Sequence, residues 1–118
     1  VAEHTFALML AVSKRIVEAD RFTRQGKYKG WEPMLFLGGH LNGSTIGIVG
    51  TGRIGGAVAA MAHGFGMRIL YYDVVSNKIL EGKYRAKRAG IGQLLRESDF
   101  VSLHVPLLPS TSKPFLPR

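Results

Sequence analysis

The sequence predicts an α/β protein built on a doubly wound parallel sheet. Two observations carry this prediction. Short apolar runs rich in β-branched residues alternate with segments of helical periodicity, which is typical of βαβ units with right-handed crossovers. A glycine-rich segment stands where the first apolar run meets the next helical segment. The 118 residues are enough for one compact domain.

The first part of the chain divides into a helix and an arm. Residues 1–25 predict one helix, because apolar side chains recur at helical spacing and Gly26 provides a stop. The first half of this helix is apolar nearly all round, so we expect it to be buried on more than one side. Residues 26–43 show no period and predict an extended connecting arm that carries the single tryptophan, Trp31.

The rest of the chain predicts the sheet and its helices. Strands are expected at Thr45–Val49 and at residues 67–72 and 100–105, and a long helix is expected at residues 53–65. Residues 75–80 and 93–96 are short helical candidates. The three strands are expected to be parallel and adjacent or nearly so.

Composition excludes several classes of function. Hydrophobic residues make up 46% and charged residues 20%, as in ordinary globular proteins, and the absence of cysteine excludes disulfides and thiolate metal sites. No apolar run is long enough to cross a bilayer and no signal-peptide pattern is present, so we expect a cytoplasmic protein with no membrane partner. The net charge of +8 is spread along the chain without a base-stacking platform of aromatics, so no nucleic-acid partner is expected.

The glycine-rich segment has the spacing of a dinucleotide fingerprint. It reads Gly50-Thr51-Gly52-Arg53-Ile54-Gly55, directly after a predicted strand and directly before a predicted helix. Gly50 would permit the tight turn, Gly52 the close approach of a pyrophosphate, and Gly55 the packing of the helix near the sheet. The helix amino terminus would offer N–H groups to the phosphates. The alternative is a simple strand-to-helix turn.

Asp73 closes the second predicted strand, 23 positions after Gly50. A carboxylate at this place accepts hydrogen bonds from the ribose hydroxyls and repels the 2′-phosphate of NADP. No basic residue follows at once, so the sequence favours NAD over NADP. The alternative is that Asp73 is a helix cap or turn residue.

Four stretches together resemble the D-isomer-specific 2-hydroxyacid dehydrogenases, a family that includes glyoxylate and hydroxypyruvate reductases. They are residues 1–10, 41–55, 64–73 and 98–107. The resemblance implies a Rossmann-type dinucleotide-binding domain, here partial, over residues 1–111, with residues 112–118 as a tail outside the family pattern. It also implies roles for further residues: Arg53 and Ile54 would donate backbone N–H groups to the pyrophosphate, His104, Val105 and Pro106 would line the adenosine pocket, and Thr111 would lie near the cofactor.

The resemblance also has gaps. Leu108 stands where family members usually carry a threonine, and His104 can also be a simple strand-end residue. Family members continue into strands that supply an arginine, a glutamate and a histidine for catalysis, and no such residues are recognisable here. No catalytic residue is therefore assigned, and His4, His40 and His63 are expected to be structural, with no metal site.

The resemblance implies an oxidoreductase that transfers hydride between NAD(H) and a small 2-hydroxy or 2-oxo acid of the glyoxylate or hydroxypyruvate type. It implies a homodimer for the complete protein, whereas these 118 residues alone are expected to be inactive. One alternative is a non-catalytic nucleotide-binding interaction module related to the same family. Another is an S-adenosylmethionine methyltransferase, against which the match at residues 98–107 argues.

Overall fold

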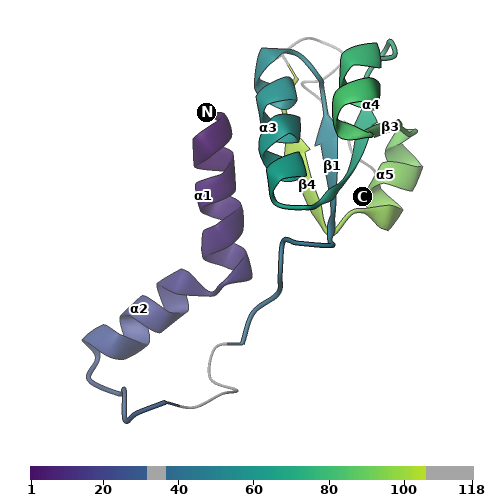
Figure 1. The fold of residues 1–118 in the computed structure, drawn as a ribbon. Helices are drawn as coiled ribbons and strands as arrows, with labels where there is room; N and C mark the ends of the chain where they lie inside the picture. The colour runs from purple at the N-terminus through teal and green to yellow at the C-terminus, as the bar shows by residue number, and fades with distance from the viewer. Residues whose placement is uncertain (32–36, 106–118) are drawn as a thin grey trace.

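A computed structural model describes residues 1–31 and 37–105 and shows a four-stranded parallel sheet with strand order β3-β2-β1-β4 (Figure 1). β1 lies between β2 and β4, as the predicted βαβ alternation requires, so the α/β fold class is confirmed. The elements in chain order are α1 (Ala2–Ser13), α2 (Ile16–Arg24), β1 (Thr45–Val49), α3 (Arg53–Gly64), β2 (Arg68–Tyr72), α4 (Lys78–Tyr84), β3 (Lys87–Arg88), α5 (Ile91–Glu97) and β4 (Phe100–Leu103).

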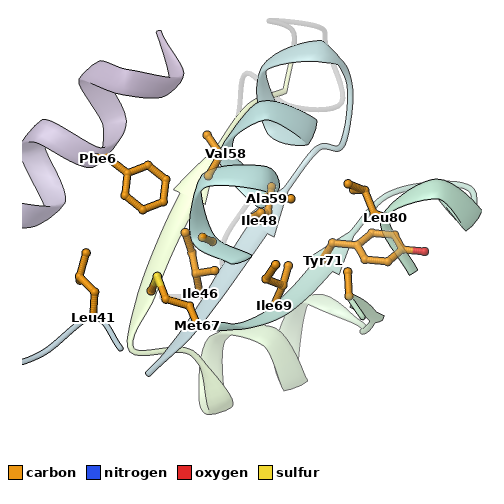
Figure 2. Packing of buried hydrophobic residues seen from close by; sticks show 12 residues of the cluster. Phe6, Leu41, Ile46, Ile48, Val58, Ala59, Met67, Ile69, Tyr71 and Leu80 are labelled. Atoms are coloured by element: carbon orange, nitrogen blue, oxygen red, sulfur yellow. The ribbon is translucent and has the colours of Figure 1, made fainter. Parts of the chain in front are cut away.

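Helices cover both faces of the sheet. α3 packs on β1 and β2 and against α4, whereas α5 packs on the opposite face of the same two strands. Because strand side chains alternate between faces, Ile46 and Ile48 of β1 point to the α3 side (Figure 2). Val49 points to the α5 side, where it packs in the cluster that contains Leu94. Every residue of β1 is buried, which explains its continuous apolar, β-branched sequence.

Gly47 in the middle of β1 lets α5 approach the sheet. A Cβ at this position would stand 2.4 Å from Leu94 Cδ2 and 2.5 Å from Ser98 Oγ. A larger residue would therefore push α5 away from the strand that leads into the glycine-rich segment.

The single helix expected over residues 1–25 is wrong. The structure has two helices, because Arg15 adopts a left-handed conformation with φ of 55° between α1 and α2. The end of α1 is instead tied to the returning arm: Ser13 Oγ donates to Gly39 O at 3.1 Å, and Gly39 N donates to Ser13 O at 3.1 Å. α2 has no buried residue and projects away from the sheet, which elongates the molecule to 53 × 32 × 25 Å (Figure 1).

α1 packs on α3 along one side only. Phe6 is buried (Figure 2). Its ring stacks on the ring of Phe65, with centroids 5.2 Å apart. Val12 is 74% exposed, so the expectation of burial on more than one side is not met among the described residues. None of the helices in residues 1–31 and 37–105 is long and apolar enough to span a membrane.

The remaining boundaries differ from prediction for local reasons. The helix expected at residues 75–80 is α4, which begins only after Asn77 because the Asn77 side chain caps it. α5 extends the candidate at residues 93–96 by a few residues at its ends, and β4 stops at Leu103. β3 was not predicted, because it consists of two exposed basic residues at the edge of the sheet.

A candidate dinucleotide-binding site at the carboxyl edge of the sheet

The glycine-rich segment is held between the ends of β2 and β4. Gly50 N donates to Tyr72 O at 2.9 Å, and Gly50 has φ of +94°, a conformation that favours glycine. A Cβ at Gly50 would stand 2.3 Å from the backbone oxygen of His104. Gly50 therefore meets two requirements at once, a left-handed turn and close contact with the chain after β4.

Gly55 and Gly52 have opposite surroundings. A Cβ at Gly55 would stand 2.0 Å from Gly50 O, so α3 can pack against the end of β1 only because no side chain intervenes. A Cβ at Gly52 would meet no atom of residues 1–31 and 37–105 within 4 Å, and Gly52 has an ordinary φ of −72°. Neither packing nor backbone conformation within the described chain calls for glycine at position 52. The open side of Gly52 fits the close approach of a group from outside the chain.

The amino terminus of α3 faces this open side. Gly52 is its N-cap, and among the described residues no side chain caps the helix and no acidic residue lies in its first turn. The first N–H groups of an α-helix have no partner within the helix, and the dipole places partial positive charge there. Arg53 and Ile54, both exposed, are the first two residues of the helix. This arrangement suits a phosphate group.

Asp73 is bound to the glycine-rich segment. Its Oδ2 accepts from Thr51 N at 3.0 Å and from Thr51 Oγ1 at 2.8 Å, and its Oδ1 accepts from Val74 N at 2.7 Å. The backbone hydrogen bond from Thr51 is the main cause that lowers the pKa of the Asp73 carboxyl below its ordinary value. Asp73 is thus an ionised turn residue in this structure. Its Oδ2 already accepts two hydrogen bonds, whereas Oδ1 accepts one and retains acceptor capacity for a ribose hydroxyl.

A second set of polar residues supports the glycine-rich segment from the side of α4. Asn77 Nδ2 donates to Thr51 O at 3.3 Å, and Asn77 N donates to the Tyr71 hydroxyl oxygen at 2.8 Å. The Tyr71 hydroxyl in turn donates to the Glu81 carboxylate. Burial raises the pKa of Tyr71, and the hydrogen bond from Tyr71 lowers the pKa of Glu81, so the proton stays on the tyrosine.

Sequence reasoning missed this support. Tyr71 reads as a strand residue and Glu81 as an exposed helical one, so only the capping residue Asn77, just before a helical segment, had a recognisable local signal. The network connects α4 with the glycine-rich segment. Thr51 is held on two sides, because its backbone N–H donates to Asp73 and its backbone oxygen accepts from Asn77.

Arg88 was also missed. It lies in β3, 15 positions after Asp73, and its Nη2 donates to Asp73 O at 3.0 Å and to Val74 O at 2.9 Å. A pocket of about 320 Å³ lies beside it. Its lining residues are Tyr72, Asp73, Arg88, Ala89, Gly90 and Gln93.

The chain after β4 closes the other side of the site. His104 N donates to Val49 O at 2.7 Å, and the His104 ring nitrogen Nε2 lies 2.6 Å from Ser102 Oγ. Burial lowers the pKa of the His104 imidazole. Val105 is half-buried against the hydrophobic cluster on the α5 side. Pro106 and Thr111 lie outside the described residues, as do Leu108 and the expected tail at 112–118.

The structure brings the described candidates together. Gly50 to Gly55, Asp73, His104 and Val105 stand at the carboxyl ends of β1, β2 and β4. This edge, where the strand order reverses direction around β1, is where ligands bind in open α/β sheets. The part of the chain that the structure describes contains no cluster of His, Asp or Glu suited to a metal ion.

Comparison with known proteins agrees with this geometry. The family described as "D-isomer specific 2-hydroxyacid dehydrogenase, NAD binding domain" matches residues 6–115. A glyoxylate reductase from Korarchaeum cryptofilum is 53% identical over 111 residues, which cover 93% of this chain and 33% of the relative. A glyoxylate reductase from Thermococcus litoralis is 52% identical over 114 residues, covering 93% of this chain and 34% of the relative.

Solved structures share the fold. D-lactate dehydrogenase from Aquifex aeolicus, solved with NAD and lactic acid, superposes with a TM-score of 0.85 at 39% identity, over 93% of this chain and 32% of that one. The TT0316 protein from Thermus thermophilus gives a TM-score of 0.87 at 43% identity, over 97% of this chain and 35% of that one. The chain spans about a third of the length of the relatives it matches. It belongs to the D-isomer-specific 2-hydroxyacid dehydrogenase family, as an NAD-binding domain.

Proposed function

We propose that the carboxyl edge of the sheet binds NAD(H) through ten residues. Gly52 and the backbone N–H groups of Arg53 and Ile54 receive the pyrophosphate, and Asp73 accepts from the ribose hydroxyls. His104 and Val105 line the adenosine pocket. The full set is Gly50, Gly52, Arg53, Ile54, Gly55, Asp73, His104, Val105, Pro106 and Thr111. The observation that carries the proposal is the open side of Gly52, since Gly50 and Gly55 are both explained by contacts within the chain.

The test is a calorimetric titration of the chain with NADH. Gly52→Val should abolish measurable binding, because the valine side chain would occupy the space of the pyrophosphate. Gly64→Val is the matched control: it lies at the other end of α3, and a Cβ there also meets no atom of the described chain within 4 Å. Circular dichroism should show both variants folded. Unchanged affinity in Gly52→Val would refute the proposed phosphate cradle.

We further propose that the complete protein is an oxidoreductase acting on a small 2-hydroxy or 2-oxo acid of the glyoxylate or hydroxypyruvate type. The similarity to glyoxylate reductases supports this substrate class. The bound dinucleotide would supply or accept the hydride at C2 of the acid. The residues of this chain would hold the dinucleotide by its phosphates and ribose, which orients it toward the acid.

The 118 residues alone should not catalyse the reaction at an enzymatic rate. General acid–base assistance is worth about 10²–10⁴-fold and orientation roughly 7–11 kcal/mol, and no described residue stands as a substrate-binding arginine or a general acid. An assay of NADH oxidation with glyoxylate and with hydroxypyruvate should give background rates. Turnover of about 1 s⁻¹ or more would show that unassigned residues perform the chemistry.

The expectations on partners and location remain proposals. A homodimer of the complete protein is supported by apolar side chains that α1 leaves open, of which Val12 is an example, and by the exposed Trp31 in the arm. A cytoplasmic location and the absence of nucleic-acid and membrane partners remain sequence-based predictions. The domain division at residue 111 is likewise a proposal.

A further inference from the structure

Arg88 brings a positive charge into the pocket beside Asp73. The Arg88 side chain extends from the edge strand β3 to the end of β2. There its Nη2 donates hydrogen bonds to the backbone oxygens of Asp73 and Val74. A guanidinium has five N–H donors, and within residues 1–31 and 37–105 no acceptor engages the others. No described carboxylate forms an ion pair with Arg88.

The neighbouring carboxylate does not neutralise this charge by contact. Both oxygens of Asp73 are engaged by N–H and hydroxyl groups of Thr51 and Val74. Arg88 and Asp73 nevertheless line the same pocket, together with Tyr72 and Gln93. The pocket therefore holds one acceptor group suited to hydroxyls and one donor group suited to a phosphate.

The two groups act differently on the adenosine 2′-position. A free 2′-hydroxyl needs only an acceptor, which Asp73 supplies, whereas a 2′-phosphate is repelled by Asp73 and attracted by Arg88. We infer that Arg88 is a specificity-determining residue for the 2′-position, so that the chain binds NADPH as well as NADH and Arg88 sets the affinity for NADPH. This inference rests on the proposed dinucleotide site. Asp73 still keeps NADH the tighter ligand.

A purely structural role for Arg88 makes a different prediction. If its guanidinium only anchors the turn after β2, its removal disturbs Asp73 and weakens both dinucleotides alike. If it contacts the 2′-phosphate, its removal weakens NADPH alone. The ratio of the NADPH affinity to the NADH affinity distinguishes these two roles, whereas the folding stability of the variant does not.

The experiment titrates the chain with NADH and with NADPH by calorimetry. In Arg88→Gln, NADPH affinity should fall on the order of tenfold, the value of a partly exposed charged hydrogen bond, and NADH affinity by less than about twofold. Arg88→Lys keeps the charge and should retain most NADPH affinity. Lys87→Gln removes a cation from the same strand but outside this pocket, and it should leave the ratio unchanged.

A second pair of variants tests whether Arg88 and Asp73 have opposite effects on NADPH affinity. Asp73→Asn should raise NADPH affinity relative to NADH, and adding Arg88→Gln should cancel most of that gain. The inference is overturned if wild-type chain binds NADH but not NADPH, or if Arg88→Gln weakens both equally or neither. Failure of the wild-type chain to bind either dinucleotide would instead overturn the proposed site.

Discussion

Gly55 is the residue at which the packing of the site is most tightly constrained. An added Cβ would stand 2.0 Å from Gly50 O, a backbone atom that cannot rotate away. Gly55→Ala should therefore lower the free energy of unfolding by about 1–3 kcal/mol, as overpacking does. The control is Gly64→Ala in the same helix, where open space and better helix propensity predict no loss or a gain of up to about 1 kcal/mol. Urea titration measures both, and equal stability of the two variants would contradict the packing role.

His104 gives the stability a defined pH dependence. Burial lowers its pKa below 6.5, so the unfolded chain binds a proton more readily than the folded chain. The stability contribution of neutral His104 is complete above pH 6.5 and is lost as the pH falls through the lowered folded value. Urea midpoints of wild type should fall between pH 7 and pH 5, and those of His104→Asn should fall less. Parallel pH profiles would indicate that other groups cause the change.

At the scale of residues, the sequence predicted what depends on local spacing. The three glycines follow one predicted strand and Asp73 closes the next. Their convergence at one edge of the sheet could therefore be anticipated from the sequence. Arg88 could not, because its approach to Asp73 depends on β3 pairing with β2. The assigned NAD-binding roles of these residues remain predictions.

Among the elements, α4 connects helix stability with the shape of the site. Asn77 Oδ1 accepts from Leu80 N at 3.1 Å as a cap, while Asn77 Nδ2 donates to Thr51 O in the glycine-rich segment. Asn77→Ala should lose about 1 kcal/mol of stability together with some NADH affinity. Asn77→Asp keeps the cap but not the donor, so it should retain stability and still weaken NADH severalfold. Wild-type affinity in Asn77→Asp would mean that the bond to Thr51 does not shape the site.

Element prediction succeeded where periodicity and burial agree. β1 is buried throughout and β2 is buried at its three central residues, and both strands were correctly placed to within a residue. The break at Arg15 carried no signal, since neither glycine nor proline marks it and the left-handed residue is an arginine. The bonds between Ser13 and Gly39 that accompany the break join positions 26 apart, which a local pattern cannot reveal.

For the molecule as a whole, β4 is an edge strand of the sheet that the described residues form. Among the described strands, β4 pairs only with β1, and Leu103 on it is 50% exposed. Unpaired edges with apolar side chains favour association between chains. Sedimentation should therefore show concentration-dependent self-association of the 118 residues, and Leu103→Lys should reduce it. A single monomeric species at all concentrations would contradict this expectation.

Trp31 has a spectroscopic consequence. It is the only tryptophan of the sequence and is 84% exposed in the arm, away from both hydrophobic clusters. Its indole already experiences water in the folded chain, so its fluorescence emission should change little when the sheet unfolds. Intrinsic fluorescence is thus a poor reporter of folding in this chain. The same indole becomes a sensitive probe of contacts made by the arm, because a shift of its emission to shorter wavelength would signal that another surface has covered it.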